Sequence, residues 1–191
     1  MILGGQTIKE EIEAGNIVID PYDPSRINPN SYNLTLSNKL LVYANKIRSA
    51  VRNGECVTEY EPTVLDMKKD NPTKTIWIPE SGLILEPGRV YLGRTVERTF
   101  TDKYVPMLEG RSSIGRLGLM IHVTAGFGDV GFDGTWTLEI VPVQPIIIYP
   151  NIQIAQIYYH TVTDTSVKYV SNKYNGQIDV TASRLYKDFE Q

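Results

Sequence analysis

The sequence predicts an all-β fold with a few short helices, arranged as a sandwich, a jelly roll or a barrel. A series of short β-like runs occupies residues 75–162: TIWIP, GLILEP, RVYLGRTVERTF, LMIHVTA, TWTLEIVPV, PIIIYP and IAQIYYHTV. Gly, Pro, Asn or Asp bounds each run, and short strands at this spacing are typical of all-β domains. The chain has no internal repeat, and its 191 residues suit one domain. We therefore expect a single domain over residues 1–191.

A helix is expected near the N-terminus. Thr7 can cap it, and Glu10 lies three residues later, as in a capping box. Ile8 and Ile12 would share its apolar face, and Gly15 would end it.

A half-buried strand is expected soon afterwards. Tyr32, Leu34 and Leu36 alternate with Asn33 and Thr35. Because successive side chains of a strand point to opposite faces, the first set should be buried and the second exposed.

Three further segments are less regular. NIVIDPYDP indicates a short strand that prolines interrupt. Residues 46–74 are polar and irregular, and we expect a loop or an insertion there. Residues 171–191 are polar and end in charged residues, which is typical of a mobile C-terminal arm.

Composition excludes several classes of protein. The chain has 22 acidic and 19 basic residues and a net charge of −3, so no global positive field exists to attract nucleic acid. The single cysteine, Cys56, allows no disulfide within the chain and fits a reducing cytosol. The acidic residues near the start are unlike a secretory signal, and no apolar run approaches the ~18 residues of a membrane span. We expect a cytoplasmic protein that binds neither membrane nor nucleic acid.

Several catalytic motifs are absent from the sequence. One Cys and two His cannot supply the ligand sets of structural zinc sites or of zinc-dependent nucleobase deaminases. The chain also lacks the G-x-x-x-x-G-K-[ST] phosphate loop, the dinucleotide fingerprint and the G-x-S-x-G elbow.

A cluster of polar residues at 111–116 is a candidate anion site. Arg111, Ser112, Ser113 and Arg116 offer guanidinium and hydroxyl donors suited to phosphate oxygens. In a helical turn, Ser112 and Arg116 would lie on one face. A solvated turn with outward charges explains the same residues equally well.

The segment from His122 to Ile140 contains three further candidates. Its glycines predict a wide turn, in which Asp129 would be an ordinary turn residue. His122, between two aliphatic residues, is more often a hydrogen-bonded core residue than a base. Glu139 alternates with apolar neighbours, and by pattern alone it is an outward-facing carboxylate. The faces expected for this strand are Trp136, Leu138 and Ile140 on one side and Thr135, Thr137 and Glu139 on the other.

Together these segments resemble the dCTP deaminases of the dUTPase-like superfamily. The matching segments are RSS at 111–113, RLGL at 116–119, HVTA at 122–125, Asp129, Gly131-Phe132, Gly134 and Leu138-Glu139, with ILGGQTI, INPNSYNLTL, KYNGQ and ASRLYKDF outside this core. Residues 46–74 remain unmatched. The resemblance implies a distorted jelly roll or β-barrel that assembles as a homotrimer, with active sites between subunits.

One detail resembles the bifunctional branch of the family. Gly126-Phe127 follows Thr124-Ala125, where enzymes that only deaminate carry a second histidine. The resemblance therefore implies conversion of dCTP through dUTP to dUMP, the precursor for thymidylate synthesis. A deaminase that releases dUTP and a non-catalytic nucleotide-binding regulator remain alternatives.

The resemblance also assigns roles to residues. Glu139 would shuttle protons, Ser112 and Arg116 would hold the attacking water, and Asp129 would serve the second hydrolysis. The residues implied in substrate binding are Arg111, Ser113, His122, Thr124, Ala125, Lys173, Tyr174 and Gln177. Residues 171–191 would form a lid over the nucleotide. Mg²⁺ would bind through phosphate oxygens and water rather than through protein ligands, without zinc, and dTTP would act as a feedback inhibitor.

Overall fold

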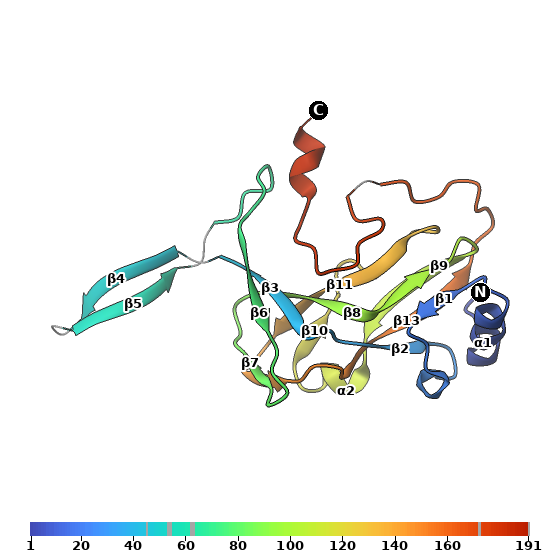
Figure 1. The fold of residues 1–191 in the computed structure, drawn as a ribbon, viewed down its shortest axis with the longest axis horizontal. Coiled ribbons are helices and arrows are strands. Elements are labelled where there is room, and N and C mark those ends of the chain that lie inside the picture. The colour runs from blue at the N-terminus through green and yellow to red at the C-terminus, as the bar shows by residue number, and fades with distance from the viewer. Residues whose placement is uncertain (45, 53–54, 62–63, 172, 191) are drawn as a thin grey trace.

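Antiparallel sheets form the body of the protein in the computed structural model, which describes residues 1–44, 46–52, 55–61, 64–171 and 173–190 (Figure 1). The strands are β1 (Val18–Asp20), β2 (Tyr32–Thr35), β3 (Lys39–Tyr43), β4 (Lys46–Arg52), β5 (Glu55–Glu61), β6 (Thr73–Trp77), β7 (Leu83–Leu85), β8 (Tyr91–Phe100), β9 (Tyr104–Gly110), β10 (Leu119–Ile121), β11 (Asp133–Pro142), β12 (Ile146–Ile148) and β13 (Gln153–Thr161). The helices are α1 (Gly5–Glu13), α2 (Ser112–Gly115), and the 3-10 turns η1 (Pro24–Arg26) and η2 (Leu185–Phe189). The prediction of an all-β fold with few short helices is confirmed.

Two sheets enclose the hydrophobic core. The larger has six strands in the order β10-β11-β8-β3-β6, with β1 also paired to β8, and the smaller has the order β2-β13-β9. Both contribute fully buried side chains to one cluster, including Leu40 and Ile140 from the first and Leu34, Leu108 and Ile157 from the second. Burying each such side chain contributes roughly 1.5–3 kcal/mol, so this cluster is the main source of stability.

Strand β2 is buried on both faces, so the prediction that Asn33 and Thr35 are exposed is wrong. They are 6% and 3% exposed. Side chains from neighbouring strands cover this face and satisfy its polar groups. Asn33 Nδ2 donates to Gln153 Oε1 at 2.8 Å, and Thr35 Oγ1 donates to Glu97 Oε1 at 2.7 Å. Polar residues can be buried here because each has a hydrogen-bond partner.

Helix α1 begins earlier than the capping pattern predicts. Its N-cap is Gly4, and Thr7 lies inside the helix rather than at its start. A tertiary contact sets this boundary: the Gly5 amide donates to the carbonyl of Pro29 at 2.7 Å, and a Cβ at Gly5 would lie 2.2 Å from the Asn28 carbonyl oxygen. The helix ends at Glu13, close to the predicted stop.

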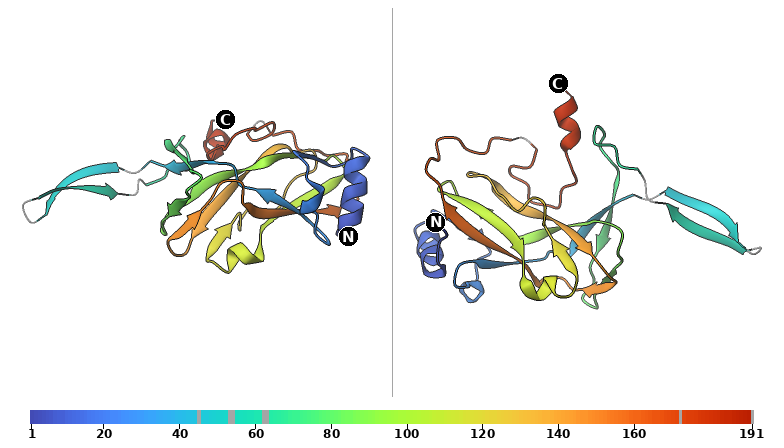
Figure 2. Two further views of the ribbon diagram at one scale, coloured as in Figure 1. Left: turned by 60° about the horizontal axis from the view of Figure 1, so that its bottom comes forward. Right: turned by 180° about the vertical axis from the view of Figure 1, so that it is seen from behind.

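A β-hairpin projects from the body where the sequence predicts a loop or an insertion. Strands β4 and β5 pair from Lys46 opposite Glu61 to Arg52 opposite Glu55, and both figures of the whole chain show the hairpin extending away from the sheets (Figures 1 and 2). The expectation of a loop is therefore wrong for these strands and for the start of β6, whereas the alternative, an insertion over residues 46–74, stays a prediction. Three of the seven residues in each strand are charged, so the composition of the segment resembles that of a loop. Residues 53–54, between these strands in the sequence, lie outside the described residues.

The C-terminal segment, residues 173–183, returns to the body and runs beside β11 (Figure 1). The short turn η2 follows it. None of the helices in the described part of the chain is long and apolar enough to span a membrane.

Candidate functional site

A cavity of about 660 Å³ lies between β8, β11, the loop of residues 122–132 and the C-terminal segment. This volume falls within the roughly 300–1,000 Å³ of small-molecule sites. The predicted site residues that line it are His122, Ala125, Asp129, Glu139, Tyr174 and Gln177. The fold therefore gathers residues that are up to 55 positions apart in the chain, from His122 to Gln177.

Glu139 reaches the cavity because β11 alternates its side chains. Leu138 and Ile140 are fully buried in the core, as predicted. Glu139 points to the opposite face, where its side chain is 37% exposed and lines the cavity. The carboxylate is thus partly shielded from water and open to a ligand.

His122 holds the carboxylate of Glu139. Its Nδ1 lies 2.6 Å from Glu139 Oε2, and its backbone amide donates to the Glu139 carbonyl at 2.9 Å. An ionised carboxylate can only accept hydrogen bonds, so Nδ1 is the donor. In neutral imidazole, Nε2 is then an acceptor, and this buried atom has no hydrogen-bond partner among the described residues.

The backbone at His122 adopts an unusual conformation. Strand β10 ends at Ile121, and His122 has φ of +53°, a region that costs most residues on the order of 1–3 kcal/mol. Histidine tolerates this region better than β-branched residues do. The conformation turns the imidazole toward β11, where His122 is only 6% exposed. Its ring meets the ring of Trp136 edge-on, with 6.3 Å between the ring centroids.

The loop after His122 places Ala125 and Asp129 at the cavity. Asp129 is exposed, in keeping with its expected place in a wide turn. Thr124 is also exposed, but it does not line the cavity. Gly128 packs so closely that an added Cβ would lie 2.5 Å from the Trp136 ring, which fixes the path of the loop beside Asp129.

The cluster at 111–116 lies elsewhere. Residues 112–116 form the helical turn considered in the sequence analysis: Ser112 is the first residue of α2, Arg116 is its C-cap, and the Arg116 amide donates to the Ser112 carbonyl at 3.0 Å. Ser112, Ser113 and Arg116 are exposed and do not line the cavity of their own chain. Arg111 donates to the carbonyl of Gln153 at 2.8 Å. All three views place α2 on the side of the body opposite the C-terminal segment (Figures 1 and 2).

The C-terminal segment forms one wall of the cavity. Tyr174 and Gln177 line it, and Tyr174 accepts a hydrogen bond from the Arg184 amide at 2.9 Å. Lys173 does not line the cavity. Its ammonium pairs with Asp188 at 2.5 Å, and this hydrogen bond raises the pKa of the lysine.

Other residues of the cavity wall were not predicted as site residues. Arg89 comes from the turn before β8 and is the one Lys or Arg side chain among the described lining residues. Thr137 could have been found, because it shares the predicted face of Glu139. Trp136 was predicted for the core; it is 7% exposed, yet its ring also borders the cavity.

The arrangement of Glu139 and His122 suits proton transfer. A carboxylate fixed by an imidazole and partly shielded from water can accept a proton from a nucleophile and return it to a leaving group. Among the described residues, no three or more His, Cys, Asp or Glu side chains come together as a metal site would require.

Comparison with known proteins assigns the family. The family model described as dCTP deaminase-like matches residues 2–162. A protein from Clostridium beijerinckii named "dCTP deaminase, dUMP-forming" is 57% identical over 191 residues, which are 100% of both chains. A protein of the same name from Hathewaya histolytica is 56% identical over 190 residues, again 100% of both chains.

A solved structure shares the fold. The crystal structure of 2'-deoxycytidine 5'-triphosphate deaminase from Agrobacterium tumefaciens matches with a TM-score of 0.59 and 18% identity, over 84% of this chain and 48% of that chain. The expected dUTPase-like fold is thereby confirmed. From the family match and the full-length similarity to these relatives, the chain belongs to the dCTP deaminase-like family.

Proposed function

We propose that this protein hydrolyses dCTP to dUMP, ammonia and pyrophosphate. The observation that carries the proposal is that Glu139, held by His122, faces a nucleotide-sized cavity. The support from relatives is that proteins named "dCTP deaminase, dUMP-forming" match the chain over its whole length.

The first reaction is the replacement of the 4-amino group by oxygen. Water adds to C4 of the cytosine ring as the C4=N3 double bond opens, and Glu139 takes one water proton and passes it to N3. Glu139 then takes the proton of the new C4 hydroxyl and gives it to the amino nitrogen, so that the C4–N bond breaks and ammonia leaves as the C4 carbonyl forms. His122 keeps the carboxylate in one orientation throughout, because its Nδ1 hydrogen bond occupies Oε2 and leaves Oε1 for the water.

We propose that a second chain completes the site, and the charge of the cavity supports this proposal. Its described lining has two carboxylates, Asp129 and Glu139, against one guanidinium, Arg89. A triphosphate needs more positive charge than this wall offers. We therefore assign Arg111, Ser112, Ser113 and Arg116 to the cavity of a neighbouring copy, within a homotrimer. Ser112 and Arg116 would hold the water and the developing charge there, while Arg111 and Ser113 would bind phosphate.

The second reaction is hydrolysis at the α-phosphorus. Water attacks phosphorus, Asp129 takes its proton, and the bond to the β-phosphate oxygen breaks to release pyrophosphate and dUMP. A Mg²⁺ ion would be held mainly by phosphate and water, and the exposed carboxylate of Asp129 at the cavity wall would be available to it. Bound in this way, Mg²⁺ would neutralise phosphate charge.

The remaining predicted residues fit nucleotide binding. Ala125 and the backbone of the loop around Thr124 would contact the pyrimidine, together with the open Nε2 of His122. Tyr174 and Gln177 would cover the nucleotide from the C-terminal segment, and Lys173 would reach the triphosphate only after leaving Asp188. The nucleotide dTTP has the same triphosphate and sugar, so we propose that it competes for this cavity.

Product analysis tests the proposal. The protein is incubated with dCTP and Mg²⁺, and nucleotides and ammonia are quantified over time. The expected result is dUMP, pyrophosphate and ammonia in equal amounts. Accumulation of dUTP would contradict the second step, and unchanged dCTP would leave only a nucleotide-binding role.

A further inference from the structure

The register between β8 and β11 breaks beside the cavity. Thr135 lies opposite Arg98 and Thr137 opposite Arg94, so the single residue Trp136 faces three residues of β8, 95 to 97. We call this feature the β8–β11 bulge. A register break of this kind leaves backbone N–H and C=O groups without their usual partners on the neighbouring strand. Buried groups of this kind need other hydrogen-bond partners.

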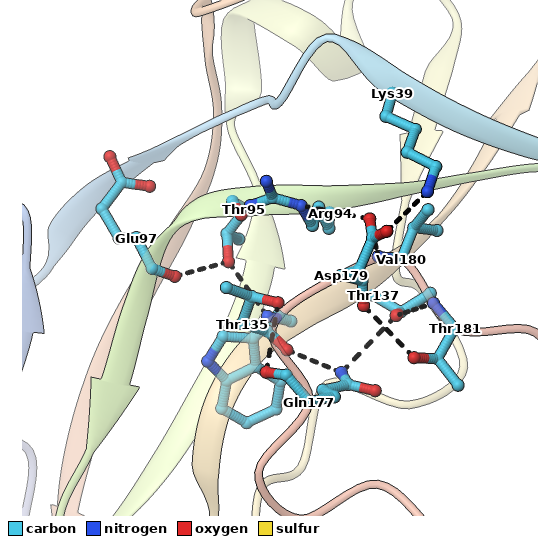
Figure 3. Close-up of polar contacts among 11 residues, drawn as sticks. Lys39, Arg94, Thr95, Glu97, Thr135, Thr137, Gln177, Asp179, Val180 and Thr181 are labelled. Atoms are coloured by element: carbon cyan, nitrogen blue, oxygen red, sulfur yellow. Dashed lines mark hydrogen bonds and ion pairs between the residues drawn. The ribbon is translucent and has the colours of Figure 1, made fainter. Parts of the chain in front are cut away.

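The hydroxyl of Thr95 bridges the bulge. It accepts a hydrogen bond from the Trp136 amide at 2.9 Å. It donates one to the Glu97 carbonyl at 2.8 Å (Figure 3). Thr95 is fully buried and does not line the cavity. The carboxylate of Glu97, also fully buried, fixes the other side of the bulge through Thr35 and Arg26. The bulge is thus held rigidly from both sides.

The C-terminal segment docks on β11 beside this bulge. Strand β10 pairs with β11 only from Ile140 to Pro142, which leaves the earlier part of that edge open. Gln177 occupies it: its carbonyl accepts from the Thr135 amide at 2.9 Å, and its Nε2 donates to the Thr135 carbonyl at 2.6 Å (Figure 3). The Thr181 amide donates to Thr137 Oγ1 at 3.2 Å.

A second connection runs from Thr95 to the same segment. The Thr95 carbonyl accepts from Arg94 at 2.9 Å, and Arg94 Nε lies 3.6 Å from Asp179 Oδ1. The other carboxylate oxygen of Asp179 lies 2.5 Å from Lys39 Nζ. Gln177 therefore bonds to backbone that the Thr95 hydroxyl holds, whereas Asp179 is held by Lys39 and lies beside Arg94, which contacts the backbone carbonyl of Thr95.

We propose that Thr95 is a positioning residue that sets the docking of the C-terminal segment over the cavity, and through it the affinity for substrate. It acts by fixing the backbone of residues 135–137, against which Gln177 and Thr181 bond. The effect on substrate affinity rests on the function proposed above; the effect on docking does not.

Limited trypsin digestion tests the docking directly. Lys173 and Arg184 flank the segment, and mass spectrometry reports cleavage after each in the intact protein without nucleotide. Thr95→Val keeps the shape of the side chain but removes the hydroxyl. We expect cleavage to be about tenfold faster, because the loss of one ordinary hydrogen bond corresponds to about that factor. Thr95→Ser keeps the hydroxyl and should restore cleavage to within about twofold of the starting protein.

Thr99→Val is the matched control. Thr99 lies on the same strand, is 3% exposed and accepts from the same tryptophan, but from its side-chain Nε1 at 2.8 Å. Loss of that bond should lower the melting temperature without speeding cleavage at Lys173 or Arg184. Equal cleavage in Thr95→Val and the starting protein, or equally fast cleavage in Thr99→Val, would overturn the proposal. Should Thr95→Val fail to fold, Thr95→Ala is judged by the same criteria.

Steady-state kinetics with dCTP complete the test. Thr95→Val should raise KM about tenfold and change kcat less than about threefold. When Gln177→Ala is already present, Thr95→Val should raise KM by a further factor of less than about two, because both changes release the same anchor. Multiplication of the two effects on KM would contradict the proposal. Absence of dCTP turnover in the starting protein would defeat the proposed function, and the trypsin result would still decide the role of Thr95.

Discussion

Nδ1 of His122 and Oε2 of Glu139 lie 2.6 Å apart, which joins the residue after β10 to the middle of β11. The contact orients one carboxylate oxygen and leaves the other facing the cavity. It also explains why a histidine is held at positive φ, since that conformation aims the ring at Glu139.

His122 should therefore affect turnover more than stability. His122→Ala removes the contact and should lower kcat on the order of 100-fold through loss of orientation. His122→Asn should be less harmful, because asparagine tolerates positive φ and its side-chain amide can still donate a hydrogen bond. Ammonia release and melting temperature are measured for both variants. Equal kcat in His122→Ala and the starting protein would exclude the orienting role.

Asp129 should act only in the second reaction. Asp129→Asn removes the proton acceptor assigned to the attack on phosphorus, so ammonia release should continue while dUTP accumulates. Chromatography of the nucleotide products measures the ratio of dUTP to dUMP. Release of pyrophosphate from dUTP at the unaltered rate would show that Asp129 has no such role.

Mixed oligomers should reveal whether active sites are shared between chains. Glu139→Gln and Arg116→Ala should each be inactive alone, because each removes one half of the proposed site. When the two variants are co-expressed in equal amounts, about one quarter of the sites should combine an intact Glu139 with an intact Arg116 from the next chain. Activity near that fraction supports a shared site. No recovery in oligomers shown to contain both variants would place Arg116 outside the site.

The Asp179 anchor should weaken at low pH. Burial alone would raise the pKa of Asp179, but hydrogen bonds from Lys39 and the Val180 amide, with the charges of Lys39 and Arg94, lower it overall. A carboxylate whose pKa is lowered by docking stabilises the docked state at pH values above the pKa of the undocked group. This contribution is lost as the pH falls through the pKa of the docked group. Hydrogen-exchange protection of residues 176–181, corrected for intrinsic rates, should fall in that acidic range. Asp179→Asn should reduce protection at neutral pH and remove most of this pH dependence. An identical pH profile in Asp179→Asn would contradict the assignment.

Much of the fold could be predicted because its strands follow the simple period of two. Leu138 and Ile140 are buried and Glu139 is not, as alternation requires. The prediction failed where tertiary contacts decide. Asn33 is buried because Gln153, far along the chain, gives its amide a partner, and helix α1 starts at Gly5 because that residue packs on Asn28. Local sequence contains neither contact.

The candidate site was predicted in part for similar reasons. The family resemblance, not the pattern of residue types, pointed to Glu139, His122 and Asp129, which the fold brings to one cavity. The sequence could not show that His122 contacts Glu139, since the contact depends on the end of β10 and a positive φ. Nor could it show that Ser112 and Arg116 lie away from the cavity of their own chain, or that Arg89 lines it.

The role of Glu139 as the proton carrier is tested most directly by Glu139→Gln, assayed for ammonia release and for nucleotide binding. Glutamine has nearly the same shape but can neither take nor return the proton. The expected result is a loss of ammonia release of about 100- to 10,000-fold, with dCTP still bound in calorimetry. Ammonia release at the unaltered rate would show that another group moves the proton.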